Sequence, residues 1–291
     1  MSHFTVGVIT KGRPSEEALE ELLSPYSENL EVEPYVDKTK QQIIDEAVED
    51  YKALEAYRAG QTEDKPWFIG DDGEVMTSSK ERIALGRKAS MGVDISDELM
   101  IDYLKANGYE SWEIDSHGGL LTTYNPKSKW DWWVVGGRWN NEIPLKADID
   151  DEDVNVSCGN MTPISNIDTH EYNSYRTPEY YSRFWDINVE GMPLAEDEDK
   201  EDFFTMYNKE YYRRTYGDKE TFIRCMRTFY MYSMLTPDGE WHELGEMGWF
   251  GCSHEEDGAR VKWIDSFEDN FITPYAKEED DYWLTVVDCH I

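Results

Sequence analysis

The sequence predicts an α+β protein, with mixed or antiparallel sheets and helices that flank them. Apolar residues occupy every second position of residues 4–8, which is the period of a β-strand. A helical repeat of apolar residues runs from about residue 38 to 59, and residues 282–291 are again typical of a strand. Strands and helices follow one another without the regular spacing of βαβ units, so the pattern favours α+β.

The N-terminal helices are predicted from their capping residues. Ser15 is expected to cap a short leucine-bearing helix. Thr39 and Gln42 have the spacing of a capping box. Ser96 is expected to cap a third helix, and residues 61–93 are expected to be loops around one short helix.

The C-terminal half has a different pattern. The aromatic stretch 130–139 favours a strand that a Gly-Gly pair bends or bulges. Residues 174–193 are aromatic without a clear period, and 200–216 are expected to form a helix. The β-branched and aromatic run 222–235 precedes a Pro-Asp-Gly turn, which predicts a hairpin.

A two-domain organisation is expected from a change in composition. Between residues 147 and 173 periodicity is absent, and acidic residues face no Lys or Arg. We therefore expect an N-terminal α+β domain over 1–146 with a tryptophan-rich core, an acidic linker or arm over 147–173, and a C-terminal α+β domain over 174–291.

The charge of the chain is strongly negative. There are 62 Asp and Glu against 28 Lys and Arg, which gives a formal net charge of −34 at pH 7. Aromatic residues make up 14% of the chain, enough apolar mass to fold despite the self-repulsion. A nucleic-acid partner is excluded, because phosphate contacts need clustered cations. Adaptation to salt, solvation alone, or a partner with a basic surface each explain the acidity.

The sequence predicts no membrane segment and no signal peptide. No run of about 18 apolar residues occurs, and the first six residues lack a basic and an apolar region. The four widely spaced cysteines form no Cys-x-x-Cys pair and are expected to remain thiols. The expected compartment is therefore the cytoplasm.

No enzyme, cofactor or metal is predicted. The phosphate-binding glycine patterns are absent. The spacing of Cys252, His254, Cys289 and His290 matches no common zinc site, and the 148–153 run lacks the glycine of a calcium loop. Pairs such as Cys225 or Cys252 with His242, and the Ser116-His117 dipeptide, lack the signature of a nucleophile.

Two acidic runs are the candidate partner-binding residues, although a charge run is more often only a solvated face. On a rigid support, spaced carboxylates resemble the phosphates of DNA. The residues are Asp148, Asp150, Asp151, Glu152, Asp153, Glu196, Asp197, Glu198 and Asp199.

Four arginines are the candidate contacts for a second copy of the chain. They form the one local basic concentration, and the alternative is pairing with carboxylates of the same chain. The residues are Arg213, Arg214, Arg224 and Arg227.

A ligand-binding alternative involves the Trp130–Trp139 region. Arg138 beside four tryptophans suits stacking or anion binding by a small-molecule-binding protein or enzyme. The simpler interpretation is a tryptophan core in which Arg138 pairs with Asp131 or a neighbouring carboxylate.

Three motifs resemble those of a phage-encoded family. They are Met-Ser-His-Phe-Thr-Val at 1–6, Lys-Trp-Asp-Trp-Trp with Gly-Gly-Arg-Trp at 129–139, and Thr-Val-Val-Asp-Cys-His at 285–290. Among phage proteins of this size and acidity, the chain is similar to the Gabija anti-defence family.

The resemblance implies a non-enzymatic inhibitor in the host bacterial cytoplasm. Such a protein oligomerises around the Gabija immune nuclease complex and prevents DNA binding and cleavage. It implies a homo-oligomer and a partner with a basic DNA-binding surface, and it assigns no catalytic residue. The other alternative is a phage host-takeover or structural protein.

Overall fold

The computed structural model has an α+β fold, as the sequence predicts, and describes residues 2–146, 160–169, 176–247, 253–277 and 281–291. The chain forms two compact units. Unit 1 comprises Met1–Leu30 and Asn125–Ile291, and unit 2 comprises Glu31–Tyr124, so that unit 2 is an insertion in unit 1. No helix in the described part of the chain combines the length and apolarity needed to cross a bilayer.

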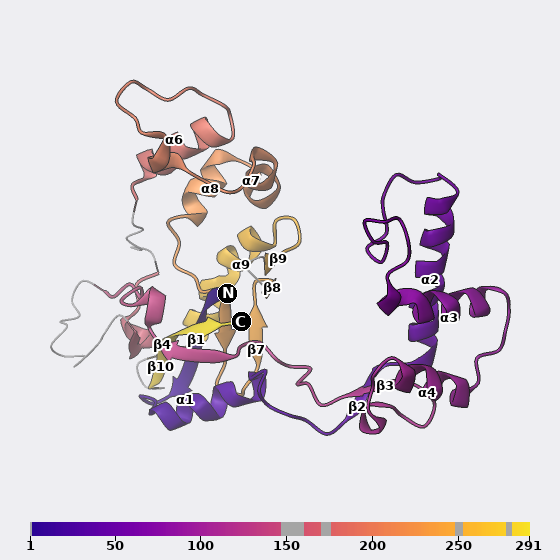
Figure 1. The fold of residues 1–291 in the computed structure, drawn as a ribbon. Helices are drawn as coiled ribbons and strands as arrows, with labels where there is room; N and C mark the ends of the chain where they lie inside the picture. The colour runs from indigo at the N-terminus through magenta and orange to yellow at the C-terminus, as the bar shows by residue number, and fades with distance from the viewer. Residues whose placement is uncertain (1, 147–159, 170–175, 248–252, 278–280) are drawn as a thin grey trace. The chain divides into compact units, whose positions relative to one another are not determined.

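Unit 1 is built on a mixed sheet of six strands (Figure 1). The strands are β1 (His3–Lys11), β4 (Trp132–Val135), β5 (Met161–Pro163), β6 (Ser233–Leu235), β7 (Trp241–Glu243) and β10 (Tyr282–His290). Their order is β4-β10-β1-β6-β7, and β5 pairs with β10 beyond the end of β4. β1 and β10 pair antiparallel over nine residues, from His3 opposite His290 to Lys11 opposite Tyr282. The two ends of the chain therefore form the centre of one sheet.

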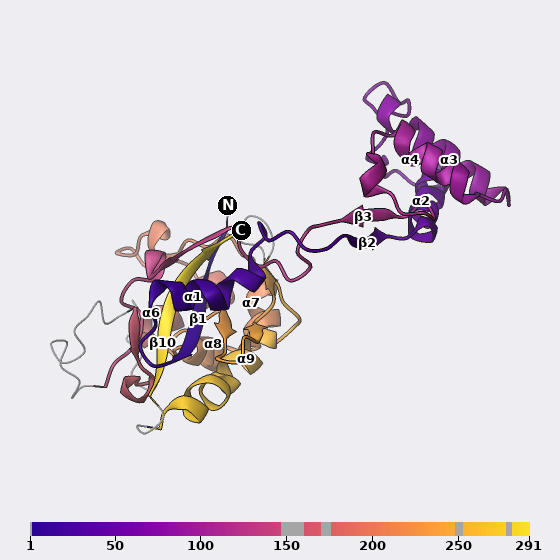
Figure 2. The same ribbon diagram turned by 90° about the horizontal axis from the view of Figure 1, so that it is seen from below.

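Each face of this sheet has its own core. On one face, Leu19 and Leu23 of α1 (Glu16–Leu23) pack with Val6, Val8 and Val287, and Figure 2 shows α1 crossing in front of β1 and β10. Ser15 caps α1 by accepting a hydrogen bond from Ala18 N, as predicted. The opposite face is covered by α9 (Ala259–Phe267) and the short helical segment that follows it. Residues of β1 and β10 thus point alternately into two cores.

A helical subdomain with an aromatic core completes unit 1. Its helices are α6 (Pro178–Asn188), α7 (Lys209–Tyr216) and α8 (Lys219–Cys225), and a second small sheet pairs β8 (Glu246–Met247) with β9 (Ser253–His254). Phe184 and Phe222 stack at 5.8 Å between ring centroids, and Trp185, Tyr212 and Cys225 pack around them.

A nearly buried ion pair joins α9 to the segment before it. Arg260 Nε donates to Glu255 Oε2 at 3.1 Å, and its Nη2 pairs with Glu255 Oε1. Arg260 Nη1 also donates to the hydroxyl of Tyr230 at 3.3 Å, while Ser253 Oγ donates to Glu255 Oε1. The charge of Arg260 is therefore compensated by one carboxylate inside the protein.

Unit 2 consists of three helices and a two-stranded sheet. The elements are α2 (Lys40–Arg58), α3 (Lys80–Ser90), α4 (Asp97–Ala106), β2 (Tyr35–Lys38) and β3 (Leu120–Thr122). The predicted capping box of Thr39 with Gln42 and the predicted cap at Ser96 are both confirmed. Gly86 lies where α3 meets α2, and a Cβ there would overlap the carbonyl group of Ala47. This close approach requires glycine.

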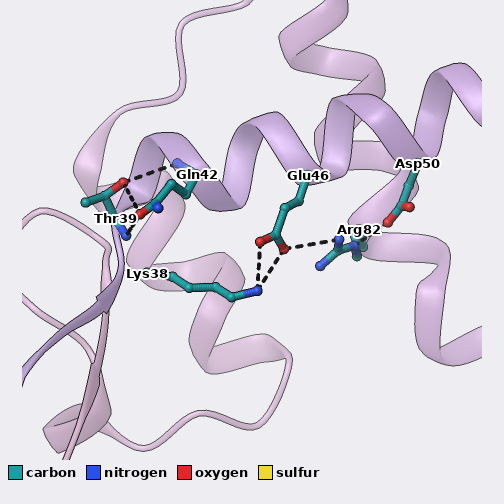
Figure 3. Close-up of polar contacts among 6 residues, drawn as sticks. All are labelled: Lys38, Thr39, Gln42, Glu46, Asp50 and Arg82. Atoms are coloured by element: carbon teal, nitrogen blue, oxygen red, sulfur yellow. Dashed lines mark hydrogen bonds and ion pairs between the residues drawn. The ribbon is translucent and has the colours of Figure 1, made fainter. Parts of the chain in front are cut away.

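A chain of ion pairs holds α2, α3 and β2 together (Figure 3). Lys38 Nζ lies 2.7 Å from Glu46 Oε1, and Arg82 Nη2 lies 3.4 Å from Glu46 Oε2. Arg82 Nε also donates to Asp50 Oδ2 at 2.6 Å. These contacts lower the pKa of Glu46, and the hydrogen bond from Lys38 contributes most.

Three sequence-based expectations are wrong. Residues 174–193 were expected to be irregular, but 178–188 form a helix, because Thr177 caps it and Pro178 occupies its first position. The expected helix over 200–216 is interrupted, since a 3₁₀ turn ends at Phe203 and Asn208 caps α7 separately. Only Ser233–Leu235 of the run 222–235 forms a strand, since the run begins inside α8, which Asp218 caps and which ends at Cys225.

The structure divides the chain at other positions than those expected from the acidic linker. Residues 1–146 and 174–291 are not separate domains, because β1 and β4 pair with β10 in one sheet. Part of the expected arm belongs to this unit, since β5 pairs with β10 and Ile164 and Ile167 are buried in the core. Residues 147–159 and 170–175 lie outside the described residues.

Candidate functional site

The three sequence motifs meet at one end of the central sheet. His3 Nδ1 lies 2.9 Å from Asp288 Oδ1, and His290 Nδ1 lies 2.6 Å from Asp131 Oδ1. The two imidazole rings pack edge to face at 4.9 Å between centroids, and Trp132 stacks on His290 at 5.2 Å. Residues 3, 131 and 288 belong to different motifs, and the strand register of β1, β4 and β10 brings them together.

This His–Asp cluster (His3, Asp131, Asp288 and His290) has the features of a structural contact that holds neighbouring strands together. His3, Asp288 and His290 are almost fully enclosed, and each imidazole Nδ1 is engaged by a carboxylate. In the described part of the chain, no group of three or more His, Cys, Asp and Glu is arranged to hold a metal ion. The cluster therefore ties the chain ends to β4.

The Gly-Gly pair of the central motif lets the backbone approach Asp288 of this His–Asp cluster closely. Gly136 and Gly137 both have positive φ, at 74° and 55°, and a Cβ on Gly137 would overlap the Asp288 side chain. The backbone N–H of Arg138 then donates to Asp288 Oδ2 at 3.0 Å. The expected pairing of Arg138 with Asp131 is wrong, since Asp131 pairs with His290 and the Arg138 side chain is exposed.

The tryptophans of this region divide between a core and a surface. Trp130 is buried and donates its indole N–H to Leu23 O at 3.2 Å, which agrees with the expected tryptophan core. Trp132 stays 43% exposed on the edge strand β4. A groove of about 640 Å³ runs beside these residues, and Arg138 does not line it.

The candidate nucleophiles lie in unsuitable places. Cys225 is buried in the aromatic core, and burial raises the pKa of its thiol to about 11. Cys289, which was considered only as a metal ligand, is buried in the sheet, and burial raises the pKa of its thiol as well. His117 lies in an exposed turn, and its Nδ1 is 3.2 Å from Oδ2 of Asp97. Cys252 lies outside the described residues.

The acidic run 196–199 divides into structural and exposed members. Glu198 makes a bidentate pair with Arg183, at 2.7 Å to Nε and 2.6 Å to Nη2, and accepts a hydrogen bond from Ala195 N. Asp199 caps the following 3₁₀ turn. Glu196 and Asp197 are exposed and make no hydrogen bond or ion pair with any described residue. The candidates Asp148, Asp150, Asp151, Glu152 and Asp153 lie outside the described residues.

Acidification is expected to remove the contribution of Glu198 to stability. The hydrogen bonds from Arg183 and then from Ala195 N lower the pKa of Glu198 from 4.5 to about 2. A lowered folded-state pKa stabilises the protein above the unfolded pKa, and this stabilisation is lost as pH falls through the folded one. The wild type should therefore exceed Glu198→Gln in free energy of unfolding at pH 7, and the difference should disappear between about pH 5 and 2. Urea unfolding across this range measures it, and a constant difference would contradict the assignment.

Three of the four candidate arginines have acidic partners within the chain. Arg213 pairs with Glu190 at 3.3 Å and Arg214 with Asp257 at 3.2 Å, and Arg224 pairs with Asp265. Arg227 makes no ion pair within the described part of the chain. Together with Lys219 and Arg224 it lines an open pocket of about 590 Å³ along α8. Intrachain pairing, the alternative to an oligomer contact, thus accounts for most of these cations.

The loop that contains the 196–199 run exposes large apolar side chains. This loop, residues 192–207, connects α6 to α7 and is named here the acidic–apolar loop. Phe204 is 74% exposed and Met206 is 85% exposed. The other exposed apolar residues of the loop are Met192, Leu194 and Tyr207. Isolated exposed apolar residues are ordinary. Five within sixteen residues make this loop the candidate contact surface of the described chain.

The acidic–apolar loop is held in place by the helices beneath it. Phe203 is buried and stacks on Tyr180 at 5.4 Å between centroids, so that Phe204 points outward. Arg183 Nη2 donates to Pro193 O at 2.8 Å, and Asn188 Nδ2 donates to Phe203 O at 3.1 Å. A loop anchored at both ends presents its exposed side chains with little loss of entropy on binding.

Sequence reasoning found the carboxylates of this loop but not its apolar residues. Phe203 and Phe204 are adjacent and chemically identical, yet one is buried and the other is exposed. No local pattern separates the two positions, since both lie within 200–216, which was expected to form one helix.

Comparisons with known proteins give no relative for this chain. No family model, no curated protein and no solved structure matches it.

Proposed function

We propose that the chain is a non-enzymatic binding protein whose acidic–apolar loop docks on a basic protein surface. The observation that supports this most is the exposure of Phe204 and Met206 in the same loop as Glu196 and Asp197, whose carboxylates pair with no described residue. Apolar anchors supply affinity once water is excluded, whereas carboxylates at the rim speed the encounter and orient it.

The resemblance to the Gabija anti-defence family suggests the target. We propose a phage inhibitor that acts in the host bacterial cytoplasm on an immune nuclease complex. By covering a basic DNA-binding surface, the protein would block DNA binding and cleavage without any chemistry of its own. The net charge of −34 supports this choice, because a channel that holds DNA attracts polyanions. Assembly as a homo-oligomer belongs to the same proposal, and light scattering across a salt series tests it.

Replacing Phe204 and Met206 by serine is expected to abolish inhibition. Both side chains are mostly exposed, so the double variant should fold as the wild type does. Truncation of an interface anchor costs about 2 kcal/mol or more, so the affinity should fall by at least about thirtyfold. Co-purification with a Gabija complex, followed by a DNA-cleavage assay at two ionic strengths, measures the loss.

The carboxylates of the loop provide a separate test. Glu196→Gln with Asp197→Asn should slow association and flatten its salt dependence, while dissociation changes little. Lys200→Gln, an exposed change of one charge in the same loop, is the matched control for altered charge. Wild-type inhibition by the serine double variant, or failure of the wild type to bind any nuclease complex, would refute the proposal.

A further inference from the structure

The edge strand β4 has backbone groups that pair with no other strand in the part of the chain that the structure describes. β4 is the outer strand of the sheet, and only β10 pairs with it among the described elements. Gly136 N donates to Val286 O of β10 at 2.9 Å. Val134 and Trp132 lie two and four residues before Gly136, opposite Asp288 and His290, so their backbone groups also point towards β10. Since successive residues of a strand point their N–H and C=O groups to opposite sides, those of Trp133 and Val135 face away from the sheet.

The four residues of β4 include no charged residue and no proline, the residues that keep many native edge strands from pairing with another chain. β4 reads Trp-Trp-Val-Val, and both Trp132 and Val134 are 43% exposed. Among the described residues no strand covers this apolar edge, and an edge of this kind is a template for an additional strand.

A groove follows the same edge. Its lining includes Trp132 and Val134 from one face of β4 and Trp133 and Val135 from the other, so it runs along the edge and not over one face. The groove measures about 640 Å³, and Glu16 and Glu20 of α1 form its acidic side. Glu20 Oε2 accepts the indole N–H of Trp133 at 3.1 Å, which fixes this carboxylate beside the strand.

We propose that β4 binds an extended basic segment of a partner protein as an added β-strand. The backbone groups of Trp133 and Val135 would pair with that segment. Its alternate side chains would contact Trp132 and Val134 on one face, and Glu16 and Glu20 on the other. Strand addition of this kind gives affinity through the main chain and specificity through alternate side chains.

The charges at the groove favour such a partner over a second copy of this chain. Two copies paired through β4 would bring Glu16 and Glu20 towards the same carboxylates of the other copy, in molecules that each carry −34. Like charges at an interface oppose association. A strand that carries lysine or arginine would instead be attracted by Glu16 and Glu20. This surface is separate from the acidic–apolar loop, and the inference stands without the function proposed for that loop.

The test uses a defined probe, the capped heptapeptide Lys-Val-Lys-Val-Lys-Val-Lys. Fluorescence anisotropy measures its binding, and hydrogen exchange locates it. We expect new protection of the Trp133 and Val135 amides, with little change at Trp132 and Val134, which already pair with β10. A peptide of equal charge in which prolines replace the valines should give no such protection, because it cannot add as a strand.

A backbone variant separates strand pairing from general attraction to an anionic protein. Val135→Pro removes the backbone N–H of residue 135, which points away from β10. The affinity for the valine-containing peptide should therefore fall about tenfold. Val135→Ala keeps the N–H group and should weaken it by less than about threefold. Binding without protection at Trp133 and Val135, equal affinity for Val135→Pro, or no saturable binding would overturn the inference. A wild-type dimer that Val135→Pro converts to a monomer would overturn it too, since the occupant would then be a second copy.

Discussion

Glu255→Gln is expected to destabilise unit 1 by about 3–5 kcal/mol, the cost of removing one partner of a buried ion pair. Arg260 pairs with Glu255 through two nitrogens, and only 19% of its side chain and 11% of that of Glu255 are exposed. A guanidinium keeps its charge even where it is buried. The variant therefore leaves a cation without a counter-charge, and the Tyr230 hydroxyl does not replace it.

Hydrogen exchange of the α9 amides measures this loss directly. Protection factors should fall by about two to three and a half orders of magnitude, since 1.4 kcal/mol corresponds to a factor of ten. Asp257→Asn breaks the exposed pair with Arg214 and serves as the control, with a change of less than about 1 kcal/mol.

A double variant decides whether charge is the cause. Glu255→Leu together with Arg260→Met replaces the pair by apolar groups and should restore most of the stability. If the double variant is as unstable as Glu255→Gln, the contact acts through shape and not through charge.

Gly86→Ala is expected to force α2 and α3 apart and to destabilise unit 2. The added methyl group would overlap the carbonyl of Ala47, and a backbone group cannot rotate away as a flexible side chain can. Overpacking costs about 1–3 kcal/mol, more than the gain of about 1 kcal/mol in helix propensity. The ion pairs between Arg82 and the α2 residues Glu46 and Asp50 should weaken with it.

Hydrogen exchange again separates the two units. Amides of α2 and α3 should exchange faster in Gly86→Ala, while those of β1 and β10 should keep their wild-type rates. Ser90→Ala, an exposed change at the end of the same helix, is the matched control. Unchanged protection in α3 would show that the helices accommodate a methyl group at their contact.

Local signals in the sequence predicted the elements that local chemistry determines. Ser15, Thr39 and Ser96 each cap the helix that they were expected to cap, because a side-chain oxygen satisfies the first N–H groups wherever the helix packs. The alternation at residues 4–8 predicted β1, and the Pro-Asp-Gly turn predicted the hairpin of β6 and β7.

Tertiary packing decided the elements that were missed. Phe222 and Cys225 lie three residues apart and both face the aromatic core, so they are compatible with α8 although β-branched and aromatic neighbours favour a strand. The pairing of His3 with His290 spans almost the whole chain, and no local pattern reports it. The domain boundaries followed from this pairing and not from composition.

The candidate site was predicted in part for the same reason. A carboxylate run is visible in the sequence, but the burial of Phe203 and the exposure of Phe204 depend on which ring meets Tyr180. Likewise, Glu198 differs from Glu196 mainly through its pairing with Arg183, which lies on another element. The sequence therefore predicts the charge of this surface but not which apolar side chains are exposed on it.

The way in which unit 2 is inserted has an evolutionary consequence. Glu28 N donates to Trp130 O at 2.8 Å, so the two points where unit 1 is interrupted are neighbours within unit 1. Val32 N likewise donates to Thr123 O at 3.0 Å, which brings the two ends of unit 2 together. A short hairpin in place of residues 31–124 would leave every strand of the central sheet intact. Related genes could thus gain, lose or exchange this helical module in a single recombination event while the rest of the protein is retained.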